Sequence, residues 1–575
     1  MVAKTPIVDC HAAVYQRSSW SHDFIESLET DFPISSKARI KELDVKVIKK
    51  YFFNESCNLS TVQLLELVDD IERLGLGYRF QKYIREALKN IASRKGNNVG
   101  LEDKEHSLHE VSLKFRLLRE HSYNVSQDFV GRFKDSNGDF FGYLEKDIKG
   151  LLSLYEASYL AFEEEIDLYD AKYFGNEHLL KLNSVDKCAL LHVNHALELP
   201  LYRRMQRVQA RWYIDAYAKQ KDADLLLLEL AILDYNMIQA ELKRDLQEVS
   251  KWWKDTGLAN KLTFARDRVL ECFFWMVGVV FEPQYHSCRV GLTKVCSFIT
   301  VIDDIYDVYG TLDELEIFTN AVKRLRILTN KFRHVYLLKV SYFLYLFLCY
   351  RWDISAVKHM PNYLQITFVA LYNTINEMGN KASIPILAKE WGELCEAFLL
   401  EAKWMHSKCI PTLETYLDNA WRSASGVVIL THGYCLINEE ISEDAIQSLK
   451  MSHDLMKWSS MLLRLCNDLG TSSAEIQRGE SANAISCYML DNDVSDEVAS
   501  EYVQSLIDEA WMKLTKARVK YCQGSEDCFA DMAINVARSS HCAYQYGDGH
   551  GAPDARLKDQ VLSVLIQPIE NVVFL

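Results

Sequence analysis

Long stretches of this 575-residue chain contain no residue that would stop a helix. The chain has 9 prolines and 23 glycines, and no proline lies between Pro33 and Pro200. Because proline and glycine are the strongest local breaks in helices and strands, their scarcity favours long uninterrupted elements. Apolar residues recur at helical spacing in segments such as 61–74, whereas the alternation typical of strands is rare. The sequence therefore predicts an all-α protein.

The length of the chain predicts more than one domain, because a single hydrophobic core stops growing at about 250 to 300 residues. A charged run at 219–222 gives way to an apolar helix that contains residues 225–228. We place a domain boundary there, with an N-terminal domain over 1–228 and a C-terminal domain over 229–575.

Composition excludes some partners. The 80 acidic residues outnumber the 65 lysines and arginines, giving a formal charge of −15 that disfavours nucleic acid as a partner. No segment reaches the ~18 to 20 uncharged apolar residues of a membrane span, so no membrane partner is expected. Residues 1–10 resemble neither a signal peptide nor a transit segment. We expect a cytoplasmic protein, or a plastid protein if a transit peptide has been removed.

Paired acidic residues occur in both halves of the chain. In the first half, Asp69 and Asp70 lie close to Arg73, a pattern that predicts ordinary solvated charges. In the second half, Asp303 and Asp307 stand four residues apart inside an apolar and aromatic run, and on a helix they share one face.

The acidic run at 302–310 needs a compensating cation. Asp304 lies beside Asp303 and Asp307, and like charges at helical spacing repel one another. Oxygen ligands without histidine or cysteine between them indicate Mg²⁺ or Mn²⁺. Taken alone, the motif is equally consistent with a solvated helix face.

A second group of oxygen donors lies farther along the chain. Asn467, Thr471 and Glu475 occupy positions i, i+4 and i+8 of one helical face, and Arg464 lies one turn earlier. This donor set also suits a hard metal ion. Two such clusters in one chain favour a metal site over two unrelated surface faces.

Other residues are candidates for the wall of a cavity near these clusters. Arg266 and Arg268 form a pair of cations, and Trp275 lies in an apolar helix that Pro283 should end. Cys296 and Thr300 precede the acidic run. Ser425 belongs to a Ser/Gly helix break at 423–426, and Tyr544 lies near the end of the chain. Read individually, each is equally consistent with ordinary packing.

Together these motifs resemble the plant terpene synthases of the ionisation-initiated class, the class I mono- and sesquiterpene synthases. The motif DDxxD occurs at 303–307, (N/D)Dxx(S/T)xxxE at 467–475, and RxR at Arg266 and Arg268. The resemblance implies a non-catalytic N-terminal α-barrel and a C-terminal catalytic helical bundle. It also implies three Mg²⁺ ions, a prenyl diphosphate substrate (geranyl or farnesyl diphosphate) and a monomeric enzyme.

The resemblance assigns a role to each candidate. The metal ligands would be Asp303, Asp304, Asp307, Asn467, Thr471 and Glu475. Arg266, Arg268 and Arg464 would bind the diphosphate of the substrate. Asp303, Asp307 and Asn467 would also contribute to substrate binding. Cys296, Thr300 and Ser425 would lie along the prenyl chain. Trp275 and Tyr544 would stabilise the allylic cation through their aromatic faces.

One departure from the family pattern bears on the product. Many monoterpene-forming members carry RRx8W, and here Trp20 is present while Cys10 and His11 replace the arginines. The family associates that pair with isomerisation before ring closure, so its loss favours an acyclic alcohol such as linalool or nerolidol. A cyclic mono- or sesquiterpene is the alternative. Rivals of other kinds are a prenyl-chain elongating enzyme, which would need a second DDxxD motif, and a non-catalytic helical scaffold.

Overall fold

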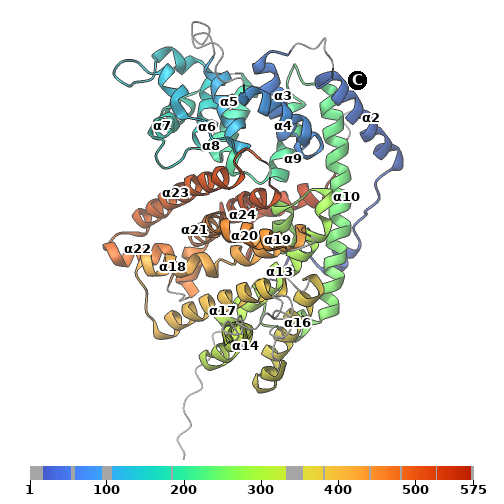
Figure 1. Cartoon of the computed structure of the whole chain (residues 1–575), viewed down its shortest axis with the longest axis vertical. Helices are drawn as coiled ribbons and strands as arrows, with labels where there is room; N and C mark the ends of the chain where they lie inside the picture. The colour runs from blue at the N-terminus through green and yellow to red at the C-terminus, as the bar shows by residue number, and fades with distance from the viewer. Residues whose placement is uncertain are drawn as a thin grey trace, which may run out of the picture.

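A computed structural model of the chain shows two helical domains that share one long helix, α10 (Figure 1). The structure describes residues 17–53, 59–93, 107–182, 186–331, 354–379, 383–438, 442–478, 482–525 and 527–570. Over these ranges it contains helices and no β-strand, apart from a single bridge between Lys134 and Phe140. The all-α prediction is confirmed. Within the described residues, no helix combines the length and the apolar character that a membrane crossing requires.

The described part of the N-terminal domain contains eight α-helices in two apolar clusters. They are α2 (Ile34–Tyr51), α3 (Thr61–Arg73), α4 (Gly77–Ser93), α5 (Leu108–Glu120), α6 (Ile148–Ser158), α7 (Ile166–Leu180), α8 (Lys187–Glu198) and α9 (Gln206–Tyr217). One cluster is formed by α2 to α5 with α9 and the start of α10, the other by α6, α7 and α8. Helix α3 matches the amphipathic segment predicted at 61–74. It begins at a reciprocal cap, because the Ser60 side chain accepts from the Gln63 amide while the Gln63 side chain accepts from the Ser60 amide.

Helix α10 (Leu225–Thr256) runs through both domains, along the side of the molecule in Figure 1. Asp224 caps its first turn, and Gly257 ends it with φ of 64°, a left-handed conformation that favours glycine. Leu228 belongs to the core of the N-terminal domain, whereas Leu242 packs with residues of the C-terminal domain. The boundary expected at residue 228 therefore falls within a continuous helix.

Both ends of the described chain pack against the other domain. At the start, α1 (His22–Glu26) places Ile25 in a cluster with residues of the C-terminal domain, and Ser18 Oγ donates to Glu271 Oε1 at 2.7 Å. Near the end, Ile569 lies in the N-terminal core, and Asn236 Nδ2 donates to its carbonyl at 2.9 Å. These crossed contacts tie the two domains together.

The C-terminal domain is a bundle of helices around a central cavity. Its helices are α11 (Leu258–Lys261), α12 (Val269–Val279), α13 (His286–Asp304), α14 (Leu312–Lys331), α16 (Asn362–Met378), α17 (Ile384–Ser407), α18 (Leu413–Ser423), α19 (Gly426–Ile437), α20 (Glu443–Met451), α21 (His453–Arg478), α22 (Ala484–Asn492), α23 (Asp496–Cys522), α24 (Cys528–Tyr544) and α25 (Ala555–Val561). Helix α12 ends before Pro283, as the sequence predicts.

Candidate active site

A cavity of about 180 Å³ lies inside the C-terminal bundle and brings most of the predicted site residues together. Its lining comes from the segment before α12, from α12, α13 and the turn that follows α13, from α17, the junction of α18 and α19, and α21, and from the end of α24 and the segment after it. The lining residues singled out in the sequence are Arg266, Trp275, Cys296, Thr300, Asp303, Asp307, Ser425, Arg464, Asn467, Thr471 and Tyr544. The described lining does not include Asp304 or Arg268.

The acidic wall of the cavity is the end of α13. This helix stops at Asp304 and continues into a wider, π-helical turn, Ile305–Tyr309, which the Gly310 amide closes by donating to the Ile305 carbonyl at 2.8 Å. Asp303 and Asp307 both reach the cavity from this segment, and the Asp303 side chain is 32% exposed. The predicted pairing of these two carboxylates on one face is therefore present.

Asp304 lies away from the cavity, in contrast to the expectation that it is a metal ligand. Its side chain is fully buried, and it accepts from the Arg266 amide at 2.6 Å and from Arg266 Nε at 2.8 Å. Burial raises the pKa of Asp304, and the Arg266 guanidinium opposes that rise. Helical spacing alone leaves Asp304 near Asp307, so its direction is set by the contact with Arg266. Its contacts hold Arg266 instead.

The two arginines of the RxR motif have different surroundings. Arg266 lines the cavity, and its Nη2 donates to Asp303 Oδ2 at 2.7 Å. Arg268 is buried and donates to the carbonyls of His550 (3.1 Å) and Gly551 (2.8 Å), in the segment after α24. Of the two arginines, Arg266 borders the described cavity and Arg268 anchors the late segment. The predicted binding of diphosphate stays a prediction for both.

Helix α21 supplies the opposite wall. Asn467 and Thr471 line the cavity one turn apart, and Arg464 Nη2 donates to Ser423 Oγ at 2.9 Å. A partly buried carboxylate that sequence reasoning missed, Glu401, accepts from the same Ser423 hydroxyl at 2.6 Å. Glu475 also lies on α21, but its side chain is outside the described residues.

Asp468, between the two predicted ligands of α21, points the other way. It is buried and accepts from the Tyr416 hydroxyl at 2.8 Å and from the Ala484 amide at 2.9 Å. These bonds tie α21 to α18 and α22. Because of these two hydrogen bonds, Asp468 contributes to helix packing, whereas its neighbour Asn467 faces the cavity.

The helix break predicted at 423–426 separates α18 from α19. Ser425 adopts φ of 65°, and the following Gly426 begins α19. A side chain at Gly426 would bring a Cβ to 2.2 Å from Ser460 Oγ, so the close approach of α19 to α21 requires glycine here. The break places Ser425 in the cavity wall.

The remaining wall is apolar and aromatic. The Trp275 and Tyr544 rings pack edge to face with centroids 5.8 Å apart, and both border the cavity. The cavity is also lined by Ile299, Phe398, Ile429 and Leu463, which sequence reasoning did not identify. Ile299 lies four residues before Asp303, Leu463 four before Asn467 and Ile429 four after Ser425, so the helical repeat could have identified these three. Phe398, on α17, has no such relation to the motifs.

His550 is a further cavity residue without an assigned role in the sequence. Its Nε2 lies 3.1 Å from Thr300 Oγ1, and the Thr300 hydroxyl also donates to the Cys296 carbonyl at 3.1 Å. Burial, with the charges of Arg266 and Arg268, lowers the pKa of His550 to about 3. The imidazole is therefore neutral at physiological pH.

The donor set of the cavity fits a hard divalent cation. Carboxylates of Asp303 and Asp307 and the oxygen-bearing side chains of Asn467 and Thr471 all border one space. Such oxygen donors match the coordination preference of Mg²⁺, which also keeps water and substrate phosphate in its shell. The apolar side of the same cavity would accommodate a hydrocarbon.

Comparisons with known proteins agree with this geometry. Residues 19–197 match the model of the terpene synthase N-terminal domain, and residues 254–513 match the metal-binding domain of the terpene synthase family. The (E)-beta-ocimene synthase of Matricaria chamomilla var. recutita is 54% identical over 97% of this chain and 91% of its own length. The chain belongs to the terpene synthase family. As a terpene synthase it is a lyase that acts on prenyl diphosphates.

Solved structures of other terpene synthases share the whole fold. Isoprene synthase from grey poplar, in complex with three Mg²⁺ ions and dimethylallyl-S-thiolodiphosphate, is 46% identical over 96% of this chain and 99% of its own, with a TM-score of 0.81. A limonene synthase with 2-fluorolinalyl diphosphate is 35% identical over 97% and 99%, with a TM-score of 0.88. The predicted fold class, enzyme class and metal cofactor, Mg²⁺, are confirmed.

Proposed function

We propose that this terpene synthase ionises geranyl diphosphate and releases an acyclic monoterpene hydrocarbon of the ocimene type together with inorganic diphosphate. The observation that carries the proposal is one cavity lined both by oxygen donors and arginines and by aromatic and aliphatic side chains. Such a lining matches a substrate with a charged head and an apolar tail. The choice of geranyl diphosphate and an acyclic hydrocarbon is supported by the relative named an (E)-beta-ocimene synthase.

At the charged side, Asp303, Asp307, Asn467 and Thr471 would hold Mg²⁺, joined by Glu475 on the strength of the sequence motif. When bound, Mg²⁺ supplies Lewis-acid stabilisation of the departing diphosphate. Arg464 Nη2 donates to Ser423 Oγ (2.9 Å) and lies 3.8 Å from the partly buried Glu401, and these contacts orient its guanidinium before the substrate arrives.

Arg266 contributes at the opposite side of the diphosphate. Its Nη2 donates to Asp303 while its Nε and amide are bound to Asp304. Asp304 thus holds Arg266 in place from the buried side, and Asp303 is the partner of Arg266 that faces the cavity. A second charge-assisted contact from Arg266 to the leaving group stabilises negative charge as the carbon–oxygen bond breaks.

The hydrocarbon side receives the positive charge. The electron pair of the broken bond leaves with the diphosphate, and the allylic cation lies beside Trp275 and Tyr544, whose rings each stabilise it by about 0.5 to 2 kcal/mol. Loss of a proton from a carbon next to the cation then forms the new double bond.

His550 is the proposed acceptor of that proton. Because the Thr300 hydroxyl donates to the Cys296 carbonyl, His550 Nε2–H is the donor to Thr300, and Nδ1 keeps its lone pair. A carbocation is a strong acid, so a neutral imidazole accepts its proton even with a pKa of about 3.

The finer expectations from the sequence remain predictions. Water capture in place of proton loss would give the acyclic alcohol expected from the replacement of the arginine pair by Cys10 and His11, which lie outside the described residues. Farnesyl diphosphate and a monomeric state likewise remain predictions. For location we favour the plastid over the cytoplasm, because the names of the ocimene and isoprene synthase relatives carry the word chloroplastic.

Parallel product analysis tests the proposal. Purified enzyme with Mg²⁺ receives geranyl, farnesyl or dimethylallyl diphosphate, and the organic extract is resolved by gas chromatography and mass spectrometry. We expect an acyclic C10 hydrocarbon from geranyl diphosphate as the main product. A trace dominated by cyclic compounds, by linalool, or by products of another prenyl diphosphate would contradict the proposed product.

A further inference from the structure

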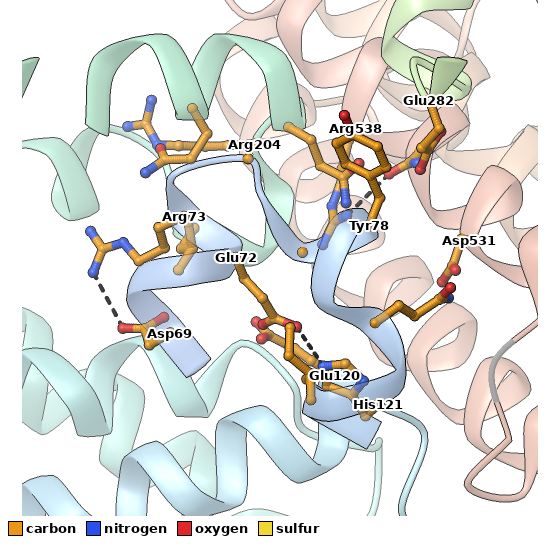
Figure 2. Close-up of a pocket in the computed structure, with 18 of the residues that line it drawn as sticks. Asp69, Glu72, Arg73, Tyr78, Glu120, His121, Arg204, Glu282, Asp531 and Arg538 are labelled. Carbon is orange, nitrogen blue, oxygen red and sulfur yellow. Dashed lines mark hydrogen bonds and ion pairs between the residues drawn. The ribbon is translucent and has the colours of Figure 1, made fainter. Parts of the chain in front are cut away.

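A second cavity, of about 220 Å³, lies between the two domains and away from the active site. Figure 2 shows side chains from α3, α4 and α5 of the first domain facing Glu282, Asp531 and Arg538 of the second. Its lining is mostly charged or amide-bearing. The residues of this lining have no role in the reaction described above.

On the N-terminal side of the cavity, the acidic groups are paired. Asp69 accepts from Arg116 Nη2 at 2.5 Å and lies 3.5 Å from Arg73, and Glu72 lies 2.7 Å from His121 Nε2 (Figure 2). The Asp69 side chain is only 15% exposed. The sequence-based prediction of solvated charge is therefore wrong for Asp69, because its partner Arg116 comes from a different helix.

On the C-terminal side, positive charge is less fully compensated. Arg518 Nη2 contacts Asp531 at 2.5 Å, but the hydrogen bonds of Arg538 to described residues go to neutral oxygens, those of Tyr202 (2.8 Å) and Asn535 (3.0 Å). Burial lowers the pKa of Arg538, and the neighbouring Arg518 lowers it further. Tyr202, Glu120 and Asp531 oppose that shift of the pKa. A partly buried cation in this situation is stabilised by an added anion.

Hydrogen-bond donors also remain unused in the lining. Gln209 is 5% exposed, and its carbonyl oxygen lies 2.8 Å from His195 Nε2, whereas its amide nitrogen has no partner among the described residues. The Nε groups of Arg73 and Arg518 likewise have no partner within the described structure. All three unsatisfied groups are donors, so the missing ligand atoms are acceptors.

We propose that this interdomain cavity binds a phosphate-type oxyanion through Gln209, Arg73, Arg518 and Arg538. Several acceptor oxygens on one small anion can meet donors that arrive from different directions, and the guanidinium group is suited to phosphate oxygens. The chemistry is the same for inorganic phosphate and for the diphosphate that the reaction releases. Because Gln209 and Arg538 belong to different domains, the bound anion stabilises the contact between the domains.

Five carboxylates among the described residues border the cavity, and four of them each contact an arginine or a histidine: Asp69, Glu72, Glu120 and Asp531. The fifth, Glu282, opposes anion binding. Glu282 borders the cavity, and burial raises its pKa to about 7, so its charge near neutral pH is partial. Replacing it with glutamine removes a repulsive charge while keeping the shape of the side chain. Gln209→Glu does the reverse, since it turns an unused donor into an anion. The two variants therefore shift phosphate affinity in opposite directions.

The test is isothermal titration calorimetry of the full chain with inorganic phosphate, and separately with inorganic diphosphate, in buffer containing EDTA. We expect Gln209→Glu to weaken phosphate binding about tenfold or more. We expect Glu282→Gln to tighten it and Arg464→Gln, altered only in the active site, to leave it unchanged. Far-UV circular dichroism and thermal unfolding check that each variant folds, and Glu282→Gln keeps the test decisive if Gln209→Glu does not fold.

The outcomes separate cleanly. Sensitivity of both anions to Gln209→Glu supports a general phosphate site, and sensitivity of diphosphate alone supports a site for the reaction product. Absence of phosphate and diphosphate binding at millimolar concentration overturns the proposal. So does binding that is lost in Arg464→Gln and unchanged by either cavity variant, because the anion then occupies only the active site.

Discussion

The two cavities of this terpene synthase are similar in size and different in the arrangement of charge. The active-site cavity, about 180 Å³, has carboxylates and arginines together with Trp275, Phe398 and Tyr544 in its lining. The interdomain cavity, about 220 Å³, has charged groups from both domains in its lining. Charge alone therefore does not identify the catalytic site. The active-site cavity is distinguished by side chains that follow the spacing of the two oxygen-donor motifs: Asp303, Asp307, Asn467 and Thr471.

The carboxylates of the two cavities differ in their neighbours. Asp303 and Asp307 come from one helical segment and face the active-site cavity together with Asn467 and Thr471, although Asp303 also contacts Arg266. In the interdomain cavity, Asp69 and Asp531 come from different helices, and each contacts an arginine. A set of convergent oxygen donors suits a hard cation, whereas carboxylates that each have their own arginine serve packing between helices.

The largest expected effect comes from removing an accessible carboxylate. Asp303→Ala should lower kcat/KM for geranyl diphosphate more than 100-fold, about 2.7 kcal/mol or more, because a metal ligand is lost. Initial rates of diphosphate release measure the loss. Its control is Asp69→Asn in the other cavity, which should lower the unfolding temperature and keep kcat/KM within about twofold. Equal losses of activity in both variants would remove the distinction between the cavities.

A smaller effect separates Asp303 from its neighbour. Asp304→Asn should lower kcat about tenfold by releasing Arg266, with little change in the Mg²⁺ concentration that gives half-maximal rate. Asp303→Asn should raise that Mg²⁺ concentration, because a charged ligand becomes neutral. Mg²⁺ titrations of the two variants show which carboxylate is a metal ligand. If Asp304→Asn shifts the Mg²⁺ dependence as strongly as Asp303→Asn does, Asp304 is also a metal ligand.

The aromatic wall should contribute less than the metal ligands. Trp275→Leu is expected to lower kcat by about 2- to 30-fold, the range that corresponds to a lost cation–π contact of 0.5 to 2 kcal/mol. Tyr544→Phe keeps the ring and is the matched control, with a rate close to that of the wild type. Single-turnover product formation measures both. A full rate in Trp275→Leu would show that the ring acts only in packing.

The sequence predicts those parts of the site that lie on one helical face. Asp303 with Asp307, and Asn467 with Thr471, follow the four-residue repeat, and all four border the cavity. The same repeat does not resolve Asp304, whose direction depends on a contact with Arg266 from another segment.

Long-range contacts account for the other differences. Nothing in the local sequence shows that Arg268 binds the carbonyls of His550 and Gly551, or that Glu401 supports Arg464 through Ser423. The fold class, by contrast, follows from helical periodicity and the scarcity of proline, which act along the chain and need no partner.

The smallest expected effect is a pH dependence of stability at the interdomain cavity. Burial raises the pKa of Glu282 from its ordinary value of 4.5 to about 7, so the folded state binds this proton more tightly than the unfolded state does. Stability is then lost as pH rises from about 4.5 to 7. Glu282→Gln should unfold about 1 to 3 °C higher than wild type at pH 8 and at the same temperature near pH 4.5. Scanning calorimetry measures both, and an equal difference at the two pH values would contradict this assignment.

The most direct test of the catalytic account is diphosphate release from geranyl diphosphate as the sole prenyl substrate. The account predicts release that requires Mg²⁺, stops with EDTA, matches the terpene product one to one, and falls more than 100-fold in Asp303→Ala. Release that persists in EDTA, that needs a second prenyl substrate, or that survives in Asp303→Ala would contradict it.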